Sequence, residues 1–231
     1  MAIWIILIIC AYLLGSVPAS FLAAKTKGID LRQYGTTQVG GGNLWRMTSW
    51  RLALPVGIFD FGKGLALVWV AQWQGLDISQ QIVVGLGAIV GHNWPVFLRF
   101  YGGRGVGTTM GIMTILPVIN EMTIWPSVAF WAIIIIGRIT LGSSPLPVLV
   151  SIVATPFLSW GFGEPLPVTL AFVTILLVIV IKRLSAQPSA VSASITKSRL
   201  LLNRLLFDRD ISDKKIWMYR KPVAKQEEWD D

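Results

Sequence analysis

Residues 91–108 read GHNWPVFLRFYGGRGVGT, a polar, glycine-rich stretch between two apolar runs that also holds the only histidine of the chain. A second such stretch, GTTQVGGGNLWR at residues 35–46, precedes another apolar run. Each brings glycines, hydroxyl or amide groups and an arginine to the end of a hydrophobic segment. Backbone N–H groups in glycine turns approach anions closely, and arginine supplies forked, charged donors. The two stretches therefore predict an anion site at a membrane surface.

The composition indicates an integral membrane protein. Of the 231 residues 54% are hydrophobic and 14% are charged, and the mean hydropathy is +0.64. Soluble domains carry roughly 25% charged residues. Cys10 is the only cysteine, so the chain has no internal disulfide. The first apolar run starts at residue 2 without a basic leader, and we expect it to be a retained span and not a signal peptide.

We predict an all-α integral membrane protein whose domain, residues 1–184, contains seven transmembrane helices. Several apolar runs approach the roughly 20 residues that cross a bilayer core. The predicted spans are residues 2–24, 52–73, 82–98, 105–120, 124–137, 145–160 and 166–181. Residues 185–231 form a basic tail, in which residues 199–207 predict an amphipathic helix on the membrane surface and residues 226–231 a disordered end.

The basic residues predict the orientation. With seven spans, nineteen of the twenty Lys and Arg residues fall in loops or tail on one side, and Lys63 lies within a span. The opposite connections contain only acidic charges. The positive-inside rule therefore places the N-terminus outside and the C-terminal tail, with both glycine-rich stretches, in the cytoplasm.

Each candidate group also has a purely structural interpretation. The glycines can serve turns and helix packing, and the arginines can serve topology alone. Asp60 and Lys63, one helical turn apart, are either a structural ion pair or functional groups within the membrane. His92 has no carboxylate at short spacing, so we expect it to position a loop or donate a hydrogen bond and not to act as a base.

The sequence lacks the residues that several other kinds of site require. One histidine and one distant cysteine exclude a multi-histidine or Cys/His metal site. The chain has neither a Gly-x-Ser-x-Gly elbow nor a Walker-type Gly-Lys-Ser/Thr motif. We therefore expect no metal and no cofactor, and neither serine hydrolase nor ATPase activity.

These residues also carry a family resemblance. The chain has, in order, Gly15-Ser-Val-Pro18 with Lys25, the 35–46 stretch, Asp60-Phe-Gly-Lys63-Gly64, and the 91–108 stretch. Together they resemble the bacterial membrane acyl-phosphate glycerol-3-phosphate acyltransferases (PlsY type), mainly over residues 11–110. That family has seven spans with an outside N-terminus, in agreement with the predicted topology.

The resemblance implies transfer of an acyl group from acyl phosphate to glycerol 3-phosphate, giving lysophosphatidate and phosphate in the first step of phospholipid synthesis. The family lacks the His/Asp dyad of other glycerolipid acyltransferases, and a substrate phosphate oxygen is thought to help deprotonate the attacking hydroxyl. The expected partners are the two substrates and membrane lipid, with no nucleic acid, in the bacterial inner membrane.

The resemblance also implies the site. The expected catalytic residues are Thr36, Asn43, Arg46 and Arg104. The expected substrate-binding residues are Ser16, Lys25, Gly40, Gly42, Lys63, His92, Gly102, Gly103, Gly105, Thr108, Ser143, Asn203 and Arg204.

The chain departs from the family pattern at several of these positions. In the first stretch Thr36 replaces a serine, Gln38 an asparagine and Gly42 a threonine, while Arg104 stands where the family has lysine. In the tail, Asn203 lies two residues from the position of the family's asparagine. Two alternative functions therefore stay open: a catalytically altered relative that binds phosphorylated lipid precursors, and a small-anion transporter that uses the same basic face.

Overall fold

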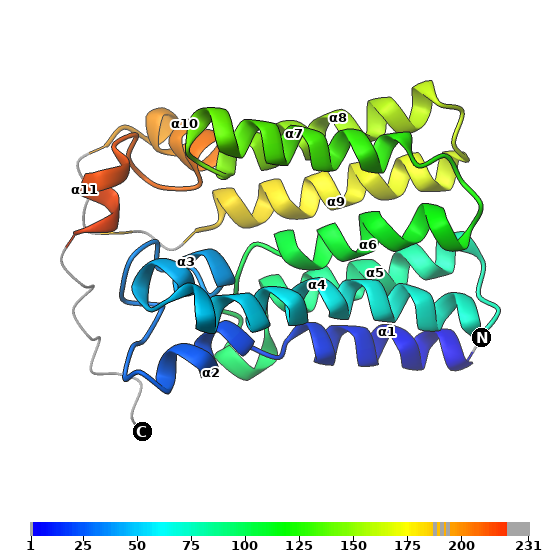
Figure 1. The fold of residues 1–231 in the computed structure, drawn as a ribbon, viewed down its shortest axis with the longest axis horizontal. Helices are drawn as coiled ribbons and strands as arrows, with labels where there is room; N and C mark the ends of the chain where they lie inside the picture. Colours follow the sequence, from blue (N-terminus) through cyan, green and yellow to red (C-terminus); the bar gives the residue numbers. More distant parts are fainter. Residues whose placement is uncertain (1, 187–188, 190–191, 193–194, 221–231) are drawn as a thin grey trace.

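The computed structural model describes residues 2–186, 189, 192 and 195–220, and their secondary structure is helical. Long helices run side by side along the molecule, and short helices gather at one end (Figure 1). The long helices are α1 (Ala2–Gly15), α4 (Trp50–Trp73), α5 (Ile78–Asn93), α6 (Val106–Ile119), α7 (Trp125–Leu141), α8 (Pro145–Gly161) and α9 (Leu166–Leu184). The short ones are α2 (Ala19–Lys25), α3 (Gly41–Met47), a 3₁₀ turn η1 (Val96–Leu98), α10 (Lys197–Phe207) and α11 (Lys214–Met218).

Four segments of the described chain are long and apolar enough to cross a membrane: Ala2–Lys25, Trp50–Trp73, Ile78–Leu98 and Leu166–Leu184. Three shorter apolar helices, α6, α7 and α8, lie beside them. The all-helical membrane fold is thus observed, whereas the count of seven crossings and the orientation of the ends stay predictions. The predicted disordered end, residues 226–231, lies outside the described residues.

The first predicted span, residues 2–24, is divided in the structure into α1 and α2. Pro18 lies between them and has no backbone N–H to continue a helical ladder. Ser16 closes the end of α1, since its Oγ donates to the Tyr12 carbonyl at 2.7 Å. The sequence GSVP therefore turns the chain toward the end of the molecule that holds the short helices.

Helices α4 and α6 pack backbone to backbone because glycines line their contact. A Cβ on Gly64 would overlap the Thr108 carbonyl, and one on Gly111 would overlap the Phe61 carbonyl. Small residues of this kind let helices in lipid approach closely. The contact fixes the start of α6, and with it the glycine-rich stretch before α6, against α4.

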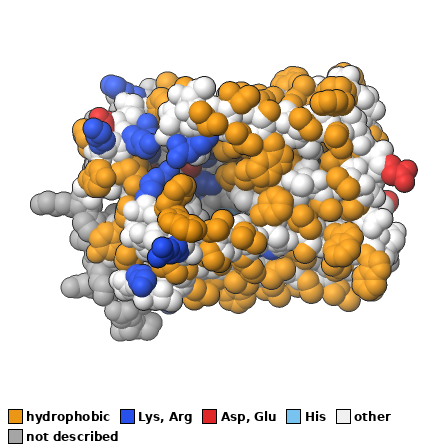
Figure 2. Space-filling view, viewed as in Figure 1, with side chains coloured by type: hydrophobic (Ala, Val, Ile, Leu, Met, Phe, Trp, Pro, Cys, Tyr) orange, Lys and Arg blue, Asp and Glu red, His pale blue; other side chains and the backbone are white. Residues whose placement is uncertain are grey.

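Apolar side chains fill the centre and also cover the outside. Ile89, Ile112, Phe130, Val148 and Ile175 join α5 through α9 in one buried cluster. Exposed large apolar side chains cover the shaft of the bundle, and Lys and Arg gather at the end of the short helices (Figure 2). An apolar outer surface of this extent is what a bilayer requires, and the basic end is where the two glycine-rich stretches lie.

Candidate active site

A cleft of about 1090 Å³ opens at the basic end. One wall comes from α3, α4 and the start of α6; the other comes from the α7–α8 turn, α8, α9 and the tail. Apolar groups such as Trp50, Leu54, Ile58 and Val148 line it together with Arg46 and Arg104. The cleft therefore offers an apolar channel that ends at cationic groups.

Asn43 organises the first glycine-rich stretch. Its Oδ1 accepts from the Thr36 N–H at 3.0 Å, and its Nδ2 donates to the carbonyls of Leu31, Tyr34 and Gln38 at 3.2, 3.0 and 3.1 Å. Asn43 is 3% exposed, and all four of these hydrogen bonds join its amide to the backbone of the loop. Asn43 thereby holds the loop that presents Thr36 and Gln38. It also lines the cleft, and the catalytic role that we expected for it stays a prediction.

The second stretch meets α4 at a buried polar cluster. Lys63 Nζ lies 2.8 Å from Asp60 Oδ1, 2.9 Å from His92 Nδ1 and 3.1 Å from the Gly15 carbonyl. An ammonium group carries three hydrogens, so Lys63 can donate one to each of these three groups. Asp60 Oδ1 also lies 3.4 Å from His92 Nδ1. When Lys63 donates to Nδ1, the imidazole carries its proton on Nε2 and His92 presents a donor. Asp60 and His92 line the cleft, and Lys63 supports them from behind.

Two glycines of the second stretch are required by close contacts. A Cβ on Gly103 would overlap His92 Nε2 and come within 2.6 Å of the Val39 carbonyl, and a Cβ on Gly102 would overlap the His92 carbonyl. Gly105 has φ +68° and begins α6 as its N-cap. Sequence reasoning assigned these glycines to substrate; the structure shows that they also let the loop fit around His92.

The two cleft arginines differ in their surroundings. Arg46 Nη1 donates to the Gly42 carbonyl at 3.1 Å, and no carboxylate among the described residues pairs with it. Desolvation, and second the charge of Arg138, lower the pKa of Arg46. Arginine nevertheless stays charged at neutral pH. Arg104, by contrast, donates through Nε to Asp208 Oδ1 at 2.6 Å and through Nη1 to the Lys182 carbonyl at 3.0 Å.

The structure brings only part of the predicted site together. The predicted residues that line the cleft are Thr36, Gly40, Gly42, Asn43, Arg46, His92, Gly103, Arg104 and Ser143. The predicted residues outside its lining are Ser16, Lys25, Lys63, Gly102, Gly105, Thr108, Asn203 and Arg204. Of the latter, Lys25 pairs with Asp30 at 3.8 Å, while Asn203 and Arg204 bind Asp210 within the tail.

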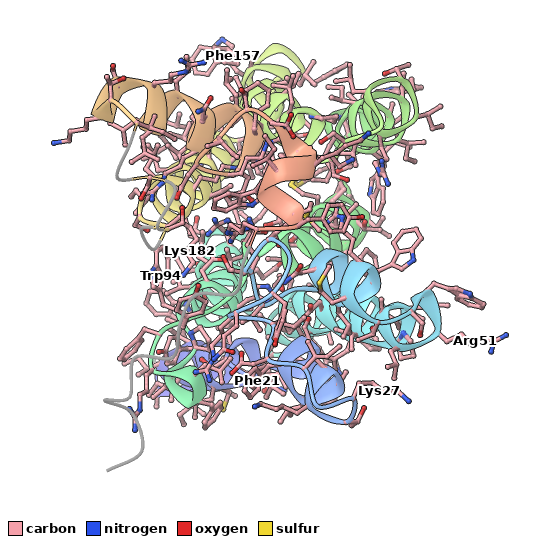
Figure 3. The ribbon with its side chains drawn as sticks, turned by 90° about the vertical axis from the view of Figure 1, so that its left-hand side faces the viewer. Phe21, Lys27, Arg51, Trp94, Phe157 and Lys182 are labelled. Atoms are coloured by element: carbon pink, nitrogen blue, oxygen red, sulfur yellow. The ribbon has the colours of Figure 1, made fainter. Side chains whose placement is uncertain are left out.

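Sequence reasoning placed Asn203 and Arg204 of the tail in the site but missed the tail residues that line the cleft, and it missed α9. Phe207, Asp208, Arg209, Lys214 and Trp217 line the cleft, as does Arg183 from α9. Arg183 ties the wall together by donating to the carbonyls of Leu205 and Pro145 at 2.6 and 2.7 Å. Figure 3, which faces the basic end, shows Lys182 beside Trp94 at the edge of this surface, and Arg51 pointing away from it.

The fold and the site define a class of protein: a helical membrane protein with a cationic cleft at one end. The glycerol-3-phosphate acyltransferase family model matches residues 5–190. "Glycerol-3-phosphate acyltransferase 4" of Dehalococcoides mccartyi (strain CBDB1) is 36% identical over 229 residues, 97% of each chain. A "Glycerol-3-phosphate acyltransferase" of Thermus thermophilus is 39% identical over 165 residues, 71% of this chain and 79% of that protein.

The solved structures agree. The crystal structure of PlsY, an integral membrane glycerol 3-phosphate acyltransferase, in its glycerol 3-phosphate form superposes with a TM-score of 0.67 at 27% identity, covering 78% of this chain and 88% of that chain. Its lysophosphatidic acid form, at 24% identity and a TM-score of 0.65, supports the fold. The chain therefore belongs to the glycerol-3-phosphate acyltransferase family.

Proposed function

We propose that the chain transfers an acyl group from acyl phosphate to glycerol 3-phosphate in this cleft, a reaction of phospholipid synthesis. The observation that carries the proposal is the composition of the cleft: an apolar channel beside α4 and α8 that ends between Arg46 and Arg104. The channel suits an acyl chain that enters from lipid. The arginines suit the two phosphate groups, which charge-assisted, forked hydrogen bonds bind well.

The described residues of the cleft include several hydrogen-bond donors but few groups that are free to accept a proton. Lys63 engages Asp60 and lies against His92 Nδ1, and Arg104 engages Asp208. We therefore expect a phosphate oxygen of the substrates to take the proton of the attacking hydroxyl. The hydroxyl oxygen bonds to the acyl carbon, the bond from that carbon to the phosphate oxygen breaks, and phosphate leaves with the proton. The protein contributes position and charge.

The basic end is proposed to face the cytoplasm of a bacterial inner membrane. Lys and Arg gather there (Figure 2), and cytoplasmic loops carry the excess of such residues in membrane proteins. Glycerol 3-phosphate, a water-soluble dianion, would then enter from the side that contains the short helices.

The donor is tested by offering the purified protein a long-chain acyl phosphate, or the matching acyl thioester, together with glycerol 3-phosphate. We expect lysophosphatidate from the acyl phosphate and none from the thioester, because the thioester lacks the second phosphate at the reacting carbon. Product from the thioester alone would overturn the proposed donor. Glycerol 3-phosphate binding without product from either would support the altered relative, and anion flux into proteoliposomes without acyl transfer would support the transporter.

A further inference from the structure

The carboxylate of Asp208 binds two donors that belong to the two glycine-rich stretches. Its Oδ1 accepts from Arg104 Nε at 2.6 Å, and its Oδ2 accepts from Gln38 Nε2 at 2.9 Å. The three residues lie in one corner of the cleft, and the Asp208 side chain is 8% exposed. Each carboxylate oxygen of Asp208 thus has its own hydrogen-bond donor, as the oxygens of a bound oxyanion would have.

The carboxylate that occupies this corner of the cleft belongs to the tail. Asp208 follows α10 in a left-handed conformation with φ 53°, a region that Asp tolerates better than most residues. The tail lies beyond residues 5–190, which the family model matches. Other contacts fix the tail independently of Asp208: Asp210 binds Arg204 at 2.7 Å and Ser189 at 2.6 Å, and Arg220 binds Thr37 at 3.2 Å.

A second phosphate cannot bind strongly to Arg104 while Asp208 stays in place. The pair is nearly neutral, and an incoming dianion would meet a carboxylate at close range. Arg46 has no such partner among the described residues. Arg46 is thus open to an anion, whereas Arg104 is already engaged by a carboxylate of the chain itself.

We infer that Gln38 and Arg104 form a phosphate subsite that Asp208 fills in the free protein and that a substrate phosphate takes over. This inference rests on the proposed function for the identity of the substrates but not for the subsite itself. Asp208 then acts as a specificity-determining residue, because only an oxyanion that competes with a tethered carboxylate enters. Gln38, where the family has asparagine, supplies the second donor of the subsite.

The test measures binding of inorganic phosphate to the purified full chain by calorimetry in detergent, which needs no turnover. If Asp208 fills the subsite about nine-tenths of the time, Asp208→Asn tightens phosphate binding about tenfold. Gln38→Leu in the Asp208→Asn background is expected to reverse most of the gain. Asp213→Asn is the matched control, since Asp213 is an exposed carboxylate of the same tail that caps α11, and asparagine caps equally well.

Unchanged or weaker phosphate binding in folded Asp208→Asn would overturn the inference, as would a gain that Gln38→Leu leaves intact.

In acyl transfer by Asp208→Asn, the KM for acyl phosphate or the KM for glycerol 3-phosphate should fall. The substrate whose KM falls is the one whose phosphate binds in the subsite. A lower kcat with both KM values unchanged would show that Asp208 only positions Arg104. If Asp208→Asn fails to fold, Asp208→Ser, which also removes the carboxylate, takes its place, and unchanged or weaker phosphate binding in that variant would overturn the inference. Tighter phosphate binding without any turnover would support the subsite while refuting the proposed reaction.

Discussion

Lys63 Nζ lies 2.9 Å from His92 Nδ1, and Asp60 Oδ1 lies 3.4 Å from the same ring nitrogen. The ammonium also binds Asp60 and the Gly15 carbonyl, so each of its hydrogens has an acceptor. With Lys63 as the donor to Nδ1, the imidazole carries its proton on Nε2, where it can donate to a phosphate or a developing oxyanion. The opposite tautomer, with Nδ1–H toward Asp60, would leave Nε2 as a base, so the role of His92 is open to a direct test.

The donor role predicts a mild effect of His92→Gln. The glutamine amide can place an N–H group near the position of His92 Nε2, so we expect kcat to fall less than about tenfold. A general base is worth roughly 10²–10⁴-fold. Steady-state acyl transfer measures the effect, and a loss of about a thousandfold in a folded variant would contradict the donor role.

Removal of one member of the buried ion pair should destabilise the protein. Asp60→Asn leaves the Lys63 charge uncompensated at a site where both side chains are at most 7% exposed. Breaking a buried pair costs about 3 kcal/mol or more. Thermal unfolding in detergent should show a lower Tm for Asp60→Asn, with partial recovery in Asp60→Asn/Lys63→Met. Equal Tm values for wild type and Asp60→Asn would show that the pair adds nothing to stability.

Gly103→Ala tests the fit of the loop around His92. The added methyl overlaps the imidazole and crowds the Val39 carbonyl, so we expect about 1–3 kcal/mol of destabilisation and reduced turnover. Gly62→Ala in α4 is the matched control, because a Cβ there meets no atom within 4 Å. The pair is compared by thermal unfolding and acyl transfer, and similar losses in both variants would refute the steric account.

Asp30 should make stability depend on pH. Burial works to raise the pKa of this carboxyl, but its hydrogen bonds and charge contact with Arg32 outweigh burial, and the net pKa lies below 3.8. A depressed folded pKa stabilises the protein above the unfolded pKa, and this contribution disappears as pH falls through the folded value. Wild type should therefore exceed Asp30→Asn in Tm at neutral pH, and the gap should close below about pH 4. A gap that persists at lower pH would contradict this.

The sequence predicted the parts of the fold that depend on local pattern. Apolar runs predicted the helices, and the glycine-rich stretches predicted the basic end and the family. The break at Pro18 was missed because the apolar pattern continues through it. The contact of Asp208 with Arg104 could not be predicted, since it joins residues 104 positions apart and depends on how the tail folds back. The partner of His92 was missed for the same reason: it comes from α4, not from its own helix.

Asn43 shows a different limit. Its type and spacing fit a family motif, and the motif implies a catalytic role, but sequence does not reveal how many hydrogen bonds the surrounding loop takes from the side chain. The structure shows four hydrogen bonds between the Asn43 amide and the backbone of residues 31–38.

The central claim is that the cleft between Arg46 and Arg104 binds the phosphorylated substrates, and kcat/KM of Arg46→Ala tests it most directly. Arg51→Ala is the matched control, because Arg51 lies at the same end of the molecule and points away from the cleft (Figure 3). A lost charged hydrogen bond of about 1.5–3 kcal/mol predicts a fall of roughly ten- to hundredfold for Arg46→Ala. Arg51→Ala should match wild type. Equal kcat/KM for Arg46→Ala and wild type would contradict the claim.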